Sequence, residues 1–387
     1  MLHPLVGHDE ARVPLARAHG KEGLPSALLL HGPRGVGKQR LAQWIAQLMV
    51  CEEPGADGPC GACKNCRLAM SLEHPDIHWY FPLPRPKGVT GDRLVDALES
   101  ARYEFLGELR ESALRPSPSD ELRGLYLGTV QGLRKRAYLS PTMASAQVFI
   151  IGDAELLVPQ EASPEAANAL LKLLEEPPKG TRFILTSSEP GRLLPTIRSR
   201  SIPLHLSPLP KASVESFLGE HTEHDTKTAA WAAGLAQGSI GRALGFLPDG
   251  DDRGPLETFR RDAFRLVQAA LADDRGTGFA TALSFSPSGA RRLVELFAFV
   301  EEWLRDLAAV AAGAGDEVIS RDAADHLASL VEAKGLAAAD ISLTLPAVER
   351  ARQLARGNVN PQLVVSGLIQ TLRAGLRPRR PNASETH

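Results

Sequence analysis

The chain has 387 residues and a formal net charge of −2, which suits two or three domains with a sizeable core and excludes a global basic field for nucleic acid. No apolar run reaches the ~18 residues that are needed to span a bilayer. The first residues also lack the pattern of a signal peptide, so we expect a cytoplasmic protein.

The first half of the sequence alternates short apolar runs with helical patterns, which predicts a parallel α/β sheet. An apolar run at 26–31 predicts a buried strand, and the glycine loop 32–38 and a helix follow it. This is the context of a P-loop, in which backbone N–H groups, the helix N-terminus and a lysine hold phosphate. The predicted nucleotide-binding residues of the loop are Gly32, Gly35, Gly37, Lys38 and Gln39.

Gln39 departs from the P-loop motif, which has Ser or Thr after the lysine. A hydroxyl at this position would bind Mg²⁺, whereas an amide oxygen is a poorer match for a small, strictly octahedral cation. We therefore expect a loop that holds phosphate, or nothing, and is a poor catalyst. The alternative of a chance glycine-rich turn is disfavoured by the strand, loop and helix context.

All four cysteines of the chain lie between positions 51 and 66. In a reducing compartment such clustering favours a metal over disulfides. Four thiolates in so short a loop can form a tetrahedron around Zn²⁺ and leave no position open for water. The sequence therefore predicts a structural zinc site formed by Cys51, Cys60, Cys63 and Cys66, the alternative being reduced cysteines without a ligand.

A segment at 82–124 interrupts the alternation after the strand expected at 77–81. Prolines at both of its ends and a helical middle indicate a surface insertion, for which a solvated spacer is favoured over a binding element. The helix expected at 129–139 then carries the basic residues Arg134, Lys135 and Arg136. A solvated face is its favoured role, and contact with DNA or a partner is the alternative.

The strand expected from Gln147 ends where a P-loop protein has its Walker B motif, in which an aspartate holds Mg²⁺ and a glutamate polarises water. Here Gly152 takes the first acidic position, and Asp153 takes the position of the glutamate. A shift of the alignment by one residue would instead make Asp153 the metal ligand. Gly152 and Gln39, the residues that depart from the two motifs, both indicate a degraded ATPase site.

The following segments carry a family resemblance. Residues 166–178 predict an apolar-striped helix stopped by two prolines, and the strand at 183–188 ends in hydroxyl side chains before Ser199 and Arg200. With the P-loop and the four cysteines, these segments resemble the bacterial clamp-loader AAA+ subunits of DNA polymerase III, from about residue 5 to 245. That family includes gamma/tau ATPases and delta-prime subunits, and the degraded ATPase site makes the chain more similar to the delta-prime members.

The resemblance implies roles for two arginines and one strand end. Arg200 matches an arginine finger that reaches the ATP of an adjacent subunit and neutralises charge on its γ-phosphate. The residues alone favour a structural surface arginine at this position. Arg242 resembles a sensor 2 arginine, which contacts the nucleotide of its own chain, with a relic or a helix-packing role as the alternative. Residues 186–188 resemble sensor 1.

The expected fold is α/β, with an AAA+ P-loop parallel sheet domain, a small helical lid and an all-α C-terminal collar. We expect the P-loop domain at 1–205, the lid at 206–252, the oligomerisation collar at 253–378 and a flexible tail at 379–387. Helical periodicity supports the all-α part, and the segment 357–363 is expected to cap its last helix. The periodic residues are Leu293, Phe297, Val300, Trp303, Leu304 and Leu307.

The resemblance therefore implies a delta-prime-like clamp-loader subunit, which helps ATP-driven loading of the sliding clamp onto primed DNA and has little or no ATPase activity. Its partners would be the gamma/tau and delta subunits in a hetero-pentamer, the sliding clamp and primed DNA. The alternatives are an active gamma/tau-like ATPase and a zinc-stabilised nucleic-acid-binding module. No polymerase or nuclease constellation is visible. The expected cofactor is structural Zn²⁺, and the degraded motifs argue against ATP with Mg²⁺ at the chain's own site.

Overall fold

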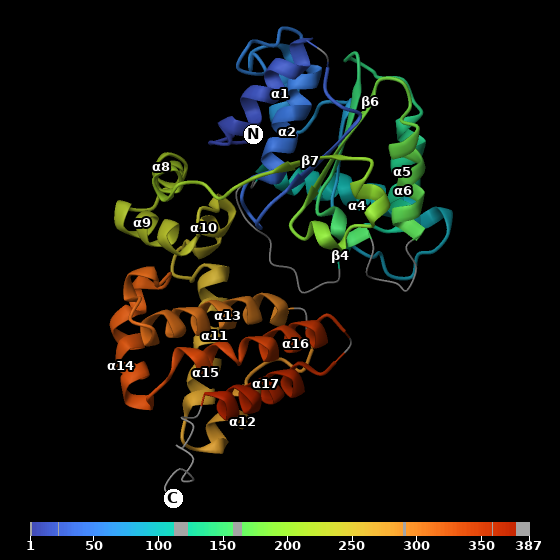
Figure 1. The fold of residues 1–387 in the computed structure, drawn as a ribbon. Coiled ribbons are helices and arrows are strands. Elements are labelled where there is room, and N and C mark those ends of the chain that lie inside the picture. The colour runs from blue at the N-terminus through green and yellow to red at the C-terminus, as the bar shows by residue number, and fades with distance from the viewer. Residues whose placement is uncertain are drawn as a thin grey trace, which may run out of the picture. The chain divides into compact units, whose positions relative to one another are not determined.

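The computed structural model describes residues 2–21, 23–111, 123–157, 165–288, 292–357 and 359–376. These residues form two compact units (Figure 1). The first unit holds the chain up to Thr222 together with residues 238–244, and the second holds residues 223–237 and the chain from Gly245 onward. Among the helices of the described part, none is both long and apolar enough to cross a membrane.

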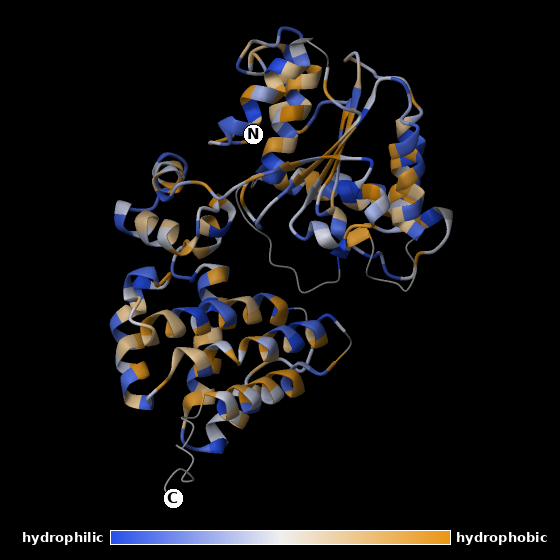
Figure 2. Ribbon diagram, viewed as in Figure 1, coloured by the Kyte–Doolittle hydropathy of each residue, from blue (hydrophilic) through white to orange (hydrophobic). Residues whose placement is uncertain are grey.

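The first unit is built on a five-stranded parallel sheet with the order β2-β5-β6-β1-β7. Its strands are β1 (Ala27–His31), β2 (Ile77–Tyr80), β5 (Gln147–Ile151), β6 (Thr181–Ser187) and β7 (Ile202–His205). Figure 2 shows that the strands are mostly hydrophobic, as strands covered on both faces are. The predicted strands at 26–31, 77–81, 147–155 and 183–188 are therefore confirmed to within a few residues.

Helices cover both faces of this sheet (Figure 1). The helices of the first unit are α1 (Asp9–Lys21), α2 (Lys38–Val50), α3 (Lys64–Met70), α4 (Asp92–Glu111), α5 (Leu127–Ala137), α6 (Glu165–Glu175), α7 (Pro195–Arg198), α8 (Lys211–His221) and the first residues of α10 (Ile240–Phe246). Successive strand residues point to opposite faces. Leu30 thus packs in the core beside α2, and Leu29 packs in the core that α5 and α6 cover.

The insertion at 82–124 is not the solvated spacer that its prolines suggested. Its ends pair as the short antiparallel strands β3 (Leu83–Pro84) and β4 (Arg123–Gly124), and α4 buries Val95 and Leu98. Glycines in α5 allow this close packing, because a Cβ on Gly128 would lie 3.1 Å from Leu98. The proline-rich stop expected at 115–119 lies outside the described residues.

The second unit is all-helical, as expected. Its helices are α9 (Thr226–Leu235), α11 (Pro255–Leu271), α12 (Arg275–Leu283), α13 (Arg292–Ala311), α14 (Ala324–Lys334), α15 (Ala338–Ser342), α16 (Leu345–Ala355) and α17 (Pro361–Gly375). The predicted periodicity of α13 is confirmed, since all six periodic residues are buried. Asn360 caps α17 by accepting a hydrogen bond from the Gln362 backbone, as the 357–363 segment predicted.

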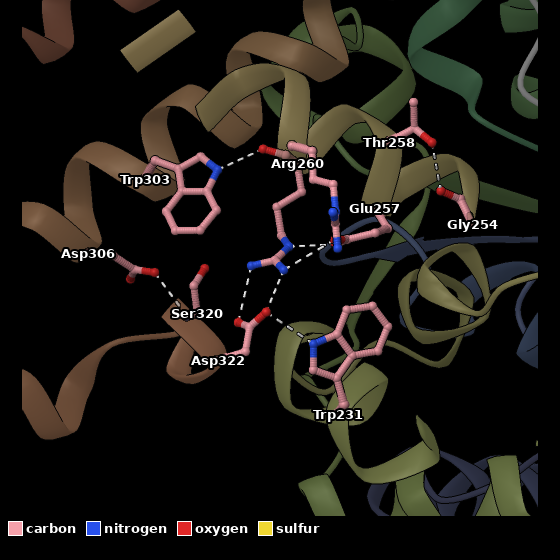
Figure 3. Close-up of polar contacts among 10 residues, drawn as sticks. Trp231, Gly254, Glu257, Thr258, Arg260, Trp303, Asp306, Ser320 and Asp322 are labelled. Carbon is pink, nitrogen blue, oxygen red and sulfur yellow. Dashed lines mark hydrogen bonds and ion pairs between the residues drawn. The ribbon is translucent and has the colours of Figure 1, made fainter. Parts of the chain in front are cut away.

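Arg260 of α11 is a buried polar centre of the second unit (Figure 3). Its guanidinium lies 2.7 Å from Glu257 and 2.6 Å from Asp322, and Trp231 of α9 donates to the same Asp322. Trp303 of α13 donates to the Arg260 carbonyl at 2.8 Å. A buried cation is tolerated when it is paired and hydrogen-bonded. The network joins α9, α11, α13 and the segment around Asp322.

The predicted α/β class, with a parallel sheet that carries the P-loop segment and an all-α C-terminal part, is thereby confirmed. The division into domain, lid, collar and tail stays a prediction, and the expected tail from 379 onward lies outside the described residues.

Candidate functional site

The predicted P-loop joins the end of β1 to the start of α2. Gly35 (φ +72°) and Gly37 (φ +103°) have left-handed backbones, which glycine adopts without steric cost. Gly37 caps α2 without a side-chain cap, so the helix presents its first-turn N–H groups and its positive dipole end to the loop. This geometry suits an anion such as phosphate.

Lys38 lies folded into the loop and is only 5% exposed. Its ammonium group donates to the carbonyl oxygens of Gly32 (2.9 Å) and Pro33 (2.7 Å) and to Ser188 Oγ (2.9 Å). Burial lowers the pKa of Lys38 to about 8, against the raising effect of Asp153 and Glu155. The lysine is thus held by the loop's own carbonyls and by the sensor 1-like segment.

Gln39 and Asp153 meet where a P-loop ATPase holds its magnesium ion. Gln39 Nε2 donates to Asp153 Oδ2 at 3.4 Å, and a Cβ on Gly152 would lie 3.2 Å from that same nitrogen. Burial and the neighbouring Glu155 raise the pKa of Asp153. Mg²⁺ at such sites takes most of its octahedral oxygen ligands from water and substrate phosphates, and one or two from the protein. Here an amide N–H stands where the hydroxyl ligand would be and a glycine stands where the first carboxylate would be, so these residues fit the ion poorly.

The segment that resembles sensor 2 lies directly on the P-loop. Gly241 N donates to Gly35 O at 3.1 Å, and Ser239 Oγ donates to Arg34 O at 3.1 Å. A Cβ on Gly35 would lie 2.4 Å from Ser239 Oγ, so only glycine permits this approach. The backbone N–H of Arg242, the predicted sensor arginine, donates to the same Ser239 Oγ.

A cavity of about 420 Å³ lies beside the P-loop and α2. This volume is within the range of small-molecule sites, roughly 300–1,000 Å³. Lys38, Gln39 and Asp153 line the cavity, and Asp153 is the single carboxylate among the described lining residues. The insertion contributes as well, through Leu109 of α4. Sequence reasoning missed this contribution because no local pattern places α4 beside α2.

Arg200 lies away from the chain's own P-loop. Arg200 precedes β7, whereas the P-loop follows β1. Because these two strands are parallel neighbours, Arg200 lies at the amino ends of the strands and the P-loop lies at their carboxyl ends. The Arg200 side chain is 35% exposed and forms an ion pair of 2.7 Å with Glu175 of α6. It also donates to Thr196 O at 3.0 Å. The structure thus brings the predicted P-loop residues together with Asp153, whereas Arg242 does not line the cavity and Arg200 lies apart.

The four cysteines come together as a compact cluster, with their sulfur atoms all within 4.8 Å of one another. Cys60 Sγ and Cys66 Sγ lie 3.9 Å apart, close to the ~3.8 Å edge of a tetrahedron with Zn–S bonds of ~2.3 Å. Backbone N–H groups of Cys60 and Cys63 point at cysteine sulfurs at 3.3 Å, which favours thiolates. The cluster therefore fits Zn²⁺.

The cysteine module is fastened to the end of α2. Asn65 Nδ2 donates to Val50 O at 2.8 Å, and Gln47 Nε2 donates to Cys66 O at 3.4 Å. Gly58 (φ +135°) lies against Trp44, where a Cβ would be 2.4 Å from the indole ring. These contacts are structural, and no cysteine lines the cavity beside the P-loop.

Comparisons with known proteins agree on one family. The model of the family described as "DNA polymerase III, delta subunit" matches residues 7–210. "DNA polymerase III subunit delta'" of Pseudomonas aeruginosa is 36% identical over 48% of this chain and 44% of that protein. The subunit of the same name from Escherichia coli is 31% identical over 60% of this chain and 57% of its own length.

A gamma/tau subunit is also similar to the chain. "DNA polymerase III subunit gamma/tau" of Mycobacterium bovis is 28% identical over 57% of this chain and 31% of that protein. The chain spans about half, or less, of the length of these curated relatives. The similarity therefore concerns a part of each protein.

Proposed function

Because the chain belongs to the DNA polymerase III delta subunit family, we propose that it is a delta-prime-like subunit of the clamp loader. In this role it helps ATP-driven loading of the sliding clamp onto primed DNA and hydrolyses little or no ATP itself. The observation that carries the proposal is that Arg200 and the P-loop, the two features of this chain that would contact phosphate, lie apart. Arg200 is exposed at the amino ends of the strands. The chain's own P-loop lies at their carboxyl ends and lacks the ligands for Mg²⁺.

Arg200 is suited to act in trans on a neighbouring subunit's ATP. Its ion pair with Glu175 joins two partly exposed side chains, and such pairs contribute ~0–1 kcal/mol, so a phosphate can readily replace the carboxylate. A guanidinium binds phosphate oxygens through a planar fork of N–H groups. Glu175 holds the side chain at the surface until an adjacent subunit presents its nucleotide.

The proposed partners follow from this arrangement, in which the chain provides the arginine and another subunit provides the ATP site. An arginine finger needs a neighbour with an active ATP site, which a gamma/tau subunit would supply, and the delta subunit would complete a hetero-pentamer. The sliding clamp and primed DNA would be reached through this assembly. The four cysteines hold Zn²⁺ in a structural role, because the cluster is fastened to α2 and lies outside the cavity.

Reconstitution tests the proposal. The chain is mixed with gamma/tau and delta subunits, and ATP turnover is measured with and without clamp and primed DNA. We expect the chain alone to show no turnover above background, and the full mixture to show stimulated turnover that is lost when the chain is omitted. Brisk hydrolysis by the isolated chain would instead favour the gamma/tau-like ATPase. An unchanged rate after omission would contradict a clamp-loader role.

A further inference from the structure

A groove of about 290 Å³ lies between α12 and α17, and all the residues that line it belong to the second unit. The two helices lie side by side (Figure 1) and approach closely at Gly278, where a Cβ would be 3.1 Å from Ile369. The volume is just below the range of small-molecule sites, roughly 300–1,000 Å³. The groove therefore suits one or two side chains of a partner better than a whole cofactor.

Two arginines line one end of this α12–α17 groove. Arg275, the first residue of α12, is exposed, whereas Arg373 of α17 is only 9% exposed. Arg373 Nη2 donates to Ala269 O at 2.8 Å, which is one of the last carbonyl groups of α11. A helix end carries about half a negative charge, so it does not offset two cations.

Neither arginine has an ion pair within the described part of the chain. Asp274 is the neighbour of Arg275, but both of its carboxylate oxygens accept hydrogen bonds of 2.7 Å from Thr277. A buried cation such as Arg373 is costly unless an anion accompanies it. A guanidinium forms its strongest hydrogen bonds with carboxylate and phosphate oxygens. This end of the groove therefore fits an acidic group.

Exposed apolar side chains continue the groove away from the arginines. Phe279 lines it and is 52% exposed, and Leu283, one turn further along the same face of α12, is 66% exposed. Leu363 of α17 is 69% exposed and belongs to the same end, because its neighbour Gln362 donates to Leu283 O at 3.2 Å. A contiguous apolar patch on a protein surface marks an interaction site.

Polar side chains of α17 lie along the groove. Ser366 and Gln370 line it, and within the described residues neither side chain forms a hydrogen bond. Their hydroxyl and amide groups can both donate and accept. They are thus available to the backbone or the polar side chains of an occupant.

From this sequence of basic, mixed and apolar surface we infer that the α12–α17 groove docks an amphipathic helical segment of another protein. The segment carries a carboxylate for the arginines and large apolar side chains one and two turns away. Arg275, Phe279 and Leu283 recur every four residues and span about 12 Å at 1.5 Å per residue. This spacing matches the anchors of a helix that lies in a groove.

A short segment fits the groove better than a whole subunit does. Permanent subunit interfaces bury roughly 2,000–5,000 Å² of mostly apolar surface, whereas this groove extends over about two helical turns and carries two cations at one end. The inference is independent of the proposed function, because it uses neither Arg200 nor the P-loop.

Selection from a library of random displayed peptides, with the full chain as target, tests the inference. The library is first depleted on Phe279→Glu, whose added charge should block the groove, and is then selected on the parent. We expect enriched peptides to share an acidic residue and two large apolar residues on one helical face. A labelled synthetic copy should bind with a dissociation constant below about 100 μM. A lack of enrichment, or enriched peptides without the acidic residue, would overturn the inference.

Matched variants assign the binding of the synthetic peptide to the two ends of the groove. Phe279→Glu and Arg275→Glu should each weaken it at least about tenfold, through lost apolar contact and through charge repulsion. The controls lie on α16: Leu354→Glu, because Leu354 is also 52% exposed, and Arg350→Glu, because Arg350 is also exposed. Neither control residue lines the groove, so the affinity should not change. Equal losses in variants and controls would overturn the assignment.

Two measurements distinguish this occupant from a loader subunit and from a second copy of the chain. The peptide should bind the reconstituted loader and the isolated chain equally well, and loss of binding on assembly would show that a subunit covers the groove. Sedimentation should find the isolated chain monomeric, and a dimer that Phe279→Glu dissociates would assign the groove to a second copy. Either result would overturn the inference. Peptide binding by the isolated chain does not require reconstitution, so the two proposals fail separately.

Discussion

The side-chain amide of Gln39 donates to Asp153 Oδ2 at 3.4 Å, so a hydrogen bond joins the first turn of α2 to the end of β5. In a P-loop ATPase a hydroxyl and a carboxylate at these places hold Mg²⁺. Here the two departures from the ATPase motifs, Gln39 and Gly152, are in direct contact, because the amide nitrogen fills the space against the glycine. We therefore propose that Gln39 and Gly152 act together in leaving this place without ligands for Mg²⁺.

Restoring the hydroxyl alone should not restore hydrolysis. Gln39→Thr removes the amide bridge, but Gly152 still provides no carboxylate, so we expect the turnover of the isolated chain to stay at background. Adding Gly152→Asp should make nucleotide affinity depend on Mg²⁺, since the shorter threonine side chain would leave free the space that the new aspartate needs. Turnover and affinity are measured in Mg²⁺ and in EDTA, and brisk hydrolysis by the single variant would contradict the account.

The zinc site should govern stability more than function. We expect Cys60→Ser to lower bound zinc and to reduce the free energy of unfolding on the order of 3 kcal/mol or more, because metal binding is coupled to folding. Metal content and chemical denaturation are the measurements. At a temperature where the variant is folded, its stimulation of the assembled loader should persist. Unchanged melting together with unchanged metal content would refute the zinc site.

The Arg260 network should be sensitive to the removal of its cation. Arg260→Met leaves the carboxylate of Asp322 without its counter-ion and leaves the buried Glu257 with Arg261 alone, and we expect a loss of about 3–5 kcal/mol in the free energy of unfolding. Arg265→Met on the same helix is the control. Its ion pair with Asp262 is exposed, so a loss of about 0–1 kcal/mol is expected in urea denaturation. Equal losses for the two variants would contradict the network's importance.

His78 should make stability fall as the pH is lowered. Burial in β2 lowers the pKa of His78 to about 4 from its ordinary 6.5, so the folded chain binds fewer protons than the unfolded chain between these values. The contribution of His78 is therefore fully present above pH 6.5 and is lost as the pH falls toward 4. By about pH 5 the loss is about 2 kcal/mol.

The His78 contribution is isolated by comparison with a variant. Urea denaturation of the parent and of His78→Asn at about pH 7 and about pH 5 should show that the parent loses about 2 kcal/mol more than the variant over this interval. The difference removes the contributions of the other histidines, which both chains share. An identical pH dependence of the two chains would show that His78 is not buried as a neutral side chain.

The sequence predicted the features that are local in the chain. The glycine loop after β1 and the cysteine spacing fix their own geometry over few residues, so the P-loop and the four-cysteine cluster were found where they were expected. The strands were found because burial on both faces makes them continuous apolar runs.

The features that sequence reasoning missed depend on tertiary packing. The prolines around the insertion suggested a spacer, although α4 packs on α5 and places Leu109 in the cavity. Arg40 and Gln43 follow the P-loop as ordinary helix residues, and only the fold shows that Arg40 Nη1 and Gln43 Nε2 are buried without an acceptor in the described part of the chain. Arg260 likewise meets Asp322 only through the fold of the second unit.

Arg200 is proposed to act on a neighbour's ATP, and ATP turnover of the assembled loader tests this role most directly. ATP turnover of the reconstituted loader, with clamp and primed DNA, is compared between the parent and Arg200→Ala at equal assembly. Arg192→Ala is the control, because Arg192 is also a surface arginine, with an ion pair of 3.1 Å to Glu189. The account predicts a loss of at least about tenfold for Arg200→Ala and none for Arg192→Ala. Full turnover with Arg200→Ala would contradict it and leave this arginine a structural role.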